Sequence, residues 1–190
     1  MTKQSNSKNI PYVALLRGIN VGGKNLISMQ SLKESFKKLG FRNVTTYINS
    51  GNVIFTSSQS DARALERKIE RMLVQEHNHA GKVVIRNFSE MTALLKQLPD
   101  TWSDDKLWKH NVIFLRHTID SEKILEALSP RSEIEEVQYH PGVLLWSAST
   151  SDLARSNMLQ LSKRNIYQEM TVRNLNTTRK IYELMKKIED

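Results

Sequence analysis

Positively charged and amide side chains gather in one glycine-rich segment near the start of this sequence. The segment reads RGINVGGKN over residues 17–25 and directly follows the apolar run YVALL. Its side chains and flexible glycine amides are hydrogen-bond donors, which suit a phosphate, a carboxylate or a nucleic-acid backbone. Two interpretations follow: a loop that cradles phosphate, or a glycine-rich turn between a strand and a helix.

The spacing from Gly18 to Lys24 matches the nucleotide-binding pattern GxxxxGK, but the next residue departs from it. Asn25 stands where a nucleotide hydrolase uses Ser or Thr to hold magnesium. The helical periodicity also begins several residues later, whereas the helix of such an enzyme opens at the lysine and directs its amides at the phosphates. Phosphoryl transfer is therefore a weaker alternative, and the sequence identifies no catalytic residue.

Apolar periodicity predicts the order strand, helix, strand, strand, helix, strand, then helix in the first half of the chain. Ser31 with Glu34 has the spacing of a helix capping box, Ser28 offers an alternative N-cap, and Asp61 can cap the second helix. The strands are expected at 10–16, 44–48, 53–55 and 83–85, with a tight turn at 49–52, and the helices at about 31–39, from residue 61, and at 88–98.

The same order recurs in the second half, after a polar segment that contains proline. Its strands are expected at 112–115, 134–139, 143–146 and 170–172, and its helices from about Asp120, Asp152 and Asn176. The sequence therefore predicts an α+β fold with two ferredoxin-like βαββαβ modules, each followed by a helix. We expect a basic N-terminal module at 1–98, a linker at 99–109 and a C-terminal module at 110–190.

Strand directions in such a sheet bring two distant turns together. The first and second strands both run antiparallel to the third, so their C-terminal ends share one edge of the sheet. We therefore expect one ligand-binding site formed by Arg17, Gly18, Asn20, Gly22, Gly23, Lys24, Asn25, Asn49, Ser50, Gly51 and Asn52. The structural alternative is that the amides only stabilise the turns, while Arg17 pairs with an acid.

The charge distribution favours an anionic partner. The net charge is +8, and the first 50 residues hold eight Lys and Arg against the single acid Glu34. A small anionic ligand is the main prediction. Binding to a nucleic-acid backbone stays open, because RNA-recognition domains share the βαββαβ order, but their stacking aromatic residues are missing here apart from Tyr12.

Composition excludes several other kinds of site. Cysteine is absent, so disulfides and thiolate chemistry are excluded, and the only close histidine pair, His77 and His79, lacks a metal-binding pattern. We expect neither a metal nor a cofactor. The mean hydropathy is -0.47, the first ten residues lack the apolar core of a signal peptide, and no apolar run approaches the roughly 18 residues that span a bilayer. We therefore expect a cytoplasmic protein without membrane contact, whose oligomeric state the sequence leaves open.

Three motifs link the chain to a known family. They are LLRGINVGGKN at 15–25, TYINSGNVIF at 46–55 and TVRNLNT at 171–177. With them the chain resembles the bacterial family catalogued as domain of unknown function 1697. The resemblance implies two α+β, ferredoxin-like subdomains but no particular activity. Leu175 stands where the family often has an aromatic residue, which weakens any proposal of base stacking at the third motif.

The third motif suggests an extension of the predicted site. Arg173 and Asn174 end the last predicted strand, and we hypothesise that packing between the modules brings them to the glycine segment. They would then line an inter-domain cleft with Arg17, Lys24, Asn49 and Ser50. The structural alternative is that Asn174 or Asn176 merely caps the last helix.

Overall fold

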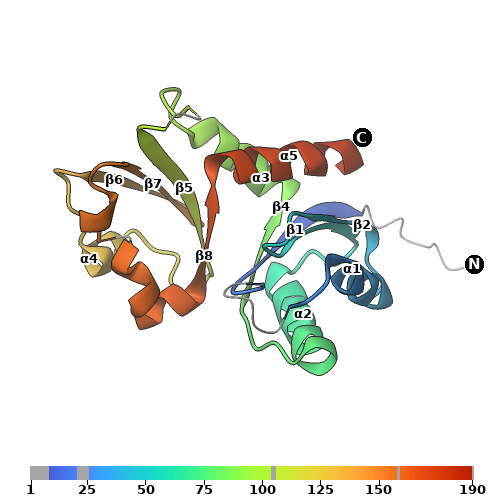
Figure 1. The fold of residues 1–190 in the computed structure, drawn as a ribbon. Helices are drawn as coiled ribbons and strands as arrows, with labels where there is room; N and C mark the ends of the chain where they lie inside the picture. The colour runs from blue at the N-terminus through green and yellow to red at the C-terminus, as the bar shows by residue number, and fades with distance from the viewer. Residues whose placement is uncertain (1–8, 21–25, 104–105, 158, 190) are drawn as a thin grey trace, which may run out of the picture. The chain divides into compact units, whose positions relative to one another are not determined.

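The computed structural model describes residues 9–20, 26–103, 106–157 and 159–189. The chain divides into two compact units (Figure 1). The first runs as far as Glu90 and also includes the segment from Ile181 onward, and the second covers Met91–Lys180. Within the described residues, no helix is long and apolar enough to cross a membrane.

The first unit has the strand order of a ferredoxin-like fold. Its four-stranded antiparallel sheet runs β2-β3-β1-β4, and α1 and α2 lie on one face of it (Figure 1). Every predicted strand and helix of the first half of the chain is present, and the last of these helices, α3, begins in the first unit and continues into the second. The elements are β1 (Ile10–Leu16), α1 (Met29–Lys38), β2 (Arg42–Tyr47), β3 (Asn52–Ser57), α2 (Ala62–His77), β4 (Val83–Asn87) and α3 (Phe88–Gln97).

The core of this unit follows from the apolar repeat of the helices and the alternating pattern of the strands. Phe36 of α1 and Ile69 of α2 recur on the apolar stripes of their helices, while Tyr12 and Phe55 point to the same face of the sheet from β1 and β3. All four are fully buried. Phe36 meets Phe55 edge-on with ring centroids 5.6 Å apart, so helices and sheet are joined by aromatic contacts.

The N-caps of α1 and α2 show that one predicted helix cap is wrong and that another is correct. The N-cap of α1 is Ser28, whose side chain accepts from the Ser31 amide at 3.0 Å. Ser31 is therefore inside the helix, and the capping box predicted for Ser31 and Glu34 is wrong, whereas the alternative cap at Ser28 is correct. Asp61 caps α2 as predicted, because its carboxylate accepts from the Arg63 amide at 2.9 Å.

The outer edge of β4 is covered by two glutamates of α2. The amides of Ile85 and Val83 donate to Glu66 at 3.3 Å and to Glu70 at 3.0 Å. These two carboxylates are one helical turn apart, so they reach alternate amides along the strand. An edge occupied in this way is protected against pairing with another chain.

The second unit repeats the strand order with different connections. Its sheet runs β6-β7-β5-β8, again antiparallel throughout. The helix α4 is short, and α5 crosses from the second unit into the first. The elements are β5 (Trp108–Leu115), α4 (Ile124–Leu128), β6 (Glu135–His140), β7 (Val143–Ser149), β8 (Met170–Asn174) and α5 (Leu175–Glu189).

The helix predicted from Asp152 is wrong. Three short 3-10 helices, Leu153–Arg155, Leu159–Lys163 and Asn165–Glu169, take its place. The first ends where Ser156 adopts extended backbone and donates its hydroxyl to the buried carboxylate of Glu135. The hydrogen bond from Ser156 to the buried Glu135 is therefore formed in place of a longer helix.

The start of α4 also differs from expectation. The prediction began this helix near Asp120, but the helix begins at Ile124. The carboxylate of Asp120 instead accepts from the Gly142 amide at 2.7 Å and from the Tyr139 hydroxyl at 2.9 Å. Asp120 therefore binds the hairpin turn and does not cap a helix.

The end of α5 belongs to the first unit. Tyr182 stacks on Phe88 with ring centroids 5.4 Å apart and planes 6° from parallel. Both residues lie in the first unit.

Whether residues 1–98 and 110–190 are separate folding domains stays a prediction.

Candidate functional site

Three segments meet at one edge of the first sheet, which we call the first rim: residues 17–20, 48–51 and 79–82. The Leu16 amide donates to the Gly51 carbonyl at 2.8 Å, and the Arg17 amide donates to the Lys82 carbonyl at 3.0 Å. The segment after β1 and the turn between β2 and β3 are therefore neighbours, as the strand directions predict. That a ligand binds there stays a prediction.

The side chain of Asn20 joins the two turns directly. Its Nδ2 donates to the carbonyls of Asn49 at 3.0 Å and Ile27 at 2.9 Å, and its Oδ1 accepts from the Ile27 amide at 2.8 Å. Asn20 has a φ of 57°, in the left-handed region that asparagine tolerates. Its carboxamide thus joins residue 20 to Ile27 and to the hairpin turn.

Asn52 and Gly51 also have structural roles. Asn52 is fully buried, and its Nδ2 donates to the Tyr47 carbonyl and to the Ser50 hydroxyl. Gly51 has a φ of 73°, and a Cβ there would lie 2.8 Å from the Leu16 Cβ, so only glycine fits. Among the other predicted site residues, Gly18 and Asn49 are exposed, and Arg17 and Ser50 are half-buried. Gly22, Gly23, Lys24 and Asn25 lie outside the described residues.

Two polar residues of this rim, His79 and Lys82, do not occur in the predicted site. His79 Nε2 lies 3.1 Å from the Arg17 carbonyl oxygen, and Lys82 is exposed where the chain enters β4. Because β4 runs antiparallel to β1, its first residues must start at the edge where β1 ends. Strand direction alone would have placed both residues at this edge, but they lie outside the sequence motifs.

Ile48 is the unusual residue of the rim. It has a φ of 47°, which is an uncommon backbone conformation for a β-branched residue, and its side chain is 49% exposed. A left-handed residue with a Cβ costs about 1–2 kcal/mol. Ile48 precedes Asn49, whose carbonyl Asn20 binds, so the local strain lies at the junction of the two turns.

The second unit has an equivalent edge, which we call the second rim: residues 116–120, 142 and 169. The Leu115 amide donates to the Gly142 carbonyl at 2.8 Å, and the Arg116 amide donates to the Glu169 carbonyl at 2.9 Å. Gly142, like Gly51, has a positive φ. Backbone geometry therefore pairs residues of the first and second rims, namely Leu16 with Leu115, Arg17 with Arg116, Gly51 with Gly142, and Lys82 with Glu169.

The two rims differ in charge. In the second rim, Glu169 lies 3.1 Å from Nε of the buried Arg116 and accepts from the Thr118 hydroxyl at 2.9 Å. Asp120 supplies another carboxylate, bound to the turn amide of Gly142. The first rim has Lys82 where the second has Glu169. In the first rim the neutral side chain of Asn20 binds the hairpin turn, whereas in the second rim the carboxylate of Asp120 binds it.

The predicted residues of the third motif lie in the second unit. Arg173 is buried, and its guanidinium donates to the Thr171 hydroxyl at 2.7 Å and to the Val172 carbonyl at 2.8 Å. Burial lowers the pKa of Arg173 to about 10, so the side chain stays charged at neutral pH. Asn174 caps α5 by accepting from the Thr177 amide at 2.8 Å, in agreement with the structural alternative. The proposed contact of Arg173 with Lys24 stays a prediction.

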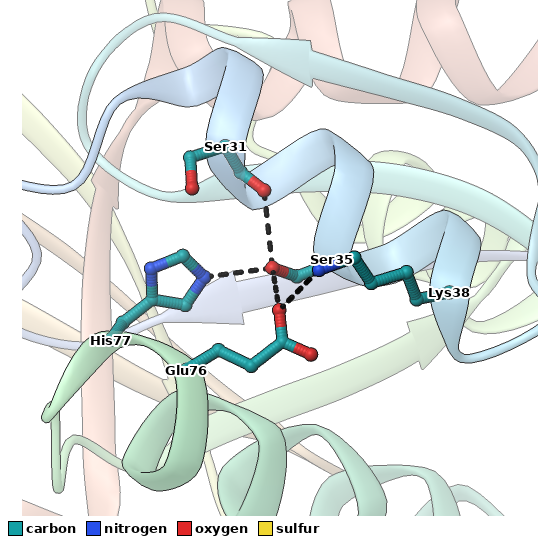
Figure 2. Close-up of polar contacts among 5 residues, drawn as sticks. All are labelled: Ser31, Ser35, Lys38, Glu76 and His77. Atoms are coloured by element: carbon teal, nitrogen blue, oxygen red, sulfur yellow. Dashed lines mark hydrogen bonds and ion pairs between the residues drawn. The ribbon is translucent and has the colours of Figure 1, made fainter.

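A serine, a glutamate and a histidine meet between α1 and α2 (Figure 2). Ser35 Oγ lies 2.6 Å from Glu76 Oε2 and 2.9 Å from His77 Nε2. A catalytic triad would need the acid to orient the histidine, but here both groups contact the serine, which is only 2% exposed. The cluster therefore links the helices. Burial lowers the pKa of His77, and the Ser35 hydrogen bond lowers that of Glu76.

The described residues contain no group of three or more His, Cys, Asp or Glu side chains that could hold a metal ion. Chemically, the arrangement of the first rim is a set of donors rather than a set of ligands for a cation. Charge-assisted hydrogen bonds to an oxyanion are the interaction that such donors make best.

Two antiparallel sheets with the same strand order define an α+β protein of two similar modules. The chain belongs to the family described as "Protein of unknown function (DUF1697)", which it matches over residues 10–145. Among solved structures it is similar to the conserved bacterial protein SP0830 from Streptococcus pneumoniae, with 29% identity and a TM-score of 0.83. That similarity covers 94% of this chain and 99% of the other. No match is found among curated proteins.

Proposed function

We propose that the first rim binds a small anionic ligand through a phosphate or carboxylate group. The observation that carries the proposal is the charge difference between the two rims. The second rim places Glu169 beside Arg116, whereas the first has Lys82 at the position of Glu169. The first rim is therefore the more positive of the two and is better suited to an external oxyanion.

The donors for such a ligand come from three segments. Arg17 and Lys24 follow β1, Ser50 lies in the hairpin turn, and Lys82 precedes β4. Each hydrogen bond to a charged group contributes roughly 1.5–3 kcal/mol when it is well formed. Asn20 and Asn52 contribute by fixing the turns, since their carboxamides bind backbone carbonyls.

Binding is better supported than phosphoryl transfer. The helix after the glycine segment begins at Met29, and its cap Ser28 already occupies the Ser31 amide. A nucleotide hydrolase instead opens its helix at the phosphate-binding lysine, within a parallel sheet. The sheet of this unit is antiparallel.

The proposal is tested by NMR titration of the 15N-labelled protein with inorganic phosphate, pyrophosphate and ATP at low salt. We expect shifts at residues 17–20, 48–51 and 82, and a roughly tenfold weaker affinity for Lys24→Ala. Lys109→Ala, which removes an exposed lysine of the second unit, is the matched control and leaves the affinity unchanged. If none of the three anions moves the rim signals at millimolar concentration, the proposal is wrong.

The nucleic-acid alternative predicts a different result. A protein that follows a phosphate backbone binds unrelated oligonucleotides with an affinity that falls steeply with salt. Salt-dependent oligonucleotide binding of this kind, without any response to the small anions, would favour this alternative.

A further inference from the structure

A groove of about 550 Å³ lies along α2, beside the segment that leads into β4. Val74 from the helix and Ala80 and Gly81 from the connecting segment form its apolar part, while Arg67, Arg71 and Lys82 line it with positive charge. Small-molecule sites commonly have volumes of roughly 300–1,000 Å³. The groove is therefore large enough for a compact ligand.

The apolar part of the groove is exposed to solvent. Val74 is 51% exposed, although the neighbouring apolar residues Met72 and Leu73 are buried in the core. A Cβ at Gly81 would lie 2.6 Å from the carbonyl oxygen of Arg17, so the close approach of this segment to the end of β1 requires glycine. An occupant of the groove with an apolar body would cover Val74.

The charged residues that line the groove have a net positive charge. Three cations line it with one acid, Glu70, whose Oε1 accepts from the Val83 amide at 3.0 Å. Arg67 lies 3.8 Å from Asp61 between largely exposed side chains, an ion pair of little strength. The groove thus combines apolar surface with positive charge, which complements a molecule that has an apolar body and a negative end.

We propose that this groove binds a small amphiphilic anion, with an apolar chain or ring against Val74 and Gly81 and one carboxylate or phosphate near Arg71 and Lys82. The site extends beyond the first rim and shares only residues 80–82 with it. The ligand class differs as well, because inorganic phosphate has no apolar part to cover Val74.

Three small probes test the proposal by calorimetry and NMR with the full chain, below micelle-forming concentrations. Decanoate should bind and shift signals of residues 71, 74 and 81. Decyltrimethylammonium, which has the same chain length and the opposite charge, and acetate, which lacks the chain, should bind at least roughly tenfold more weakly. Equal binding of decanoate and decyltrimethylammonium, or no binding of decanoate, would overturn the proposal.

Variants of exposed residues locate the site without disturbing the core. Arg71→Glu should weaken decanoate binding roughly tenfold, and Val74→Gln should weaken it roughly threefold. Arg63→Glu makes the same charge change on α2, outside the groove lining, and should match the wild type. An equal loss in Arg63→Glu would show only diffuse attraction and would overturn the proposal. The phosphate titration of the first rim depends on Lys24, so the two proposals fail separately.

Discussion

The carboxamide of Asn20 donates to the carbonyl of Asn49 at 3.0 Å, across a separation of 29 residues in the chain. The same carboxamide exchanges two hydrogen bonds with the backbone of Ile27. One side chain therefore joins the segment that follows β1 to Ile27 and to the hairpin turn. The bond exists because β1 and β2 end at the same edge of the sheet.

Removing this carboxamide should destabilise the protein. Asn20→Gly keeps a residue that tolerates the φ of 57° but loses three hydrogen bonds. We expect the free energy of unfolding to fall by about 1–3 kcal/mol. Asn20→Ala should lose about 1 kcal/mol more, because alanine is strained in this conformation. Urea denaturation measures both, and an Asn20→Gly variant as stable as the wild type would contradict the assigned role.

Relieving the strain at Ile48 should have the opposite effect. Asparagine tolerates a left-handed backbone, so Ile48→Asn should raise the free energy of unfolding by about 1 kcal/mol. Val74→Asn is the matched control, since Val74 is also β-branched and about half exposed but lies in a helix. Thermal unfolding of both variants checks the prediction. A similar gain in Val74→Asn would show that removal of exposed apolar surface, not backbone strain, is the cause.

The buried carboxylate of Glu135 should make the second unit acid-sensitive. Burial raises its pKa, but hydrogen bonds from Ser156, the Arg131 amide, Trp146 and the Asn157 amide together lower it below its usual value. A lowered pKa in the folded state stabilises the protein above the unfolded pKa near 4.3, and the contribution is lost as the pH falls. We expect wild-type stability to fall more steeply than that of Glu135→Gln between about pH 5 and pH 3.

Urea titrations at several pH values measure this difference. Glu136→Gln provides the control, because Glu136 is the exposed neighbour in β6. At neutral pH, Glu135→Gln should already cost about 2 kcal/mol, since an amide cannot accept from every donor that now surrounds the carboxylate. Parallel pH curves for the wild type and Glu135→Gln would contradict the prediction.

The contact of His77 with Ser35, which links α1 and α2, should make the stability of the protein depend on pH near pH 6. Burial lowers the pKa of His77, the nearby Glu76 raises it, and Lys38 and His79 lower it further. The unfolded chain therefore binds a proton at His77 more readily, and stability is lost as the pH falls below about 6.5. We expect His77→Gln to flatten the change in melting temperature between pH 8 and pH 5.5. His117→Gln, at an exposed histidine, should leave it as in the wild type, and equal flattening by both would count against the link.

Sequence reasoning located the elements where one local signal was decisive. β1 has the predicted bounds because an apolar run ends at a glycine. The helix expected from Asp152 is wrong although Leu153 and Leu161 have the i, i+8 spacing of one helix face, because Ser156 adopts extended backbone and donates its hydroxyl to the buried Glu135. The equivalence of the rims was invisible in the sequence, since paired residues such as Lys82 and Glu169 share backbone hydrogen bonds rather than side-chain chemistry.

Reversing the charge at the paired positions 82 and 169 should weaken anion binding at the first rim and destabilise the second rim. Lys82→Glu would give the first rim a carboxylate where the second has Glu169, so we expect inorganic phosphate to bind at least roughly tenfold more weakly, with the fold intact. Glu169→Lys would remove the carboxylate 3.1 Å from the buried Arg116 and should cost about 2–4 kcal/mol of stability. Urea denaturation and phosphate titration of both variants check the pair of outcomes. Unchanged phosphate binding in Lys82→Glu would mean that the charge difference between the rims does not govern anion binding.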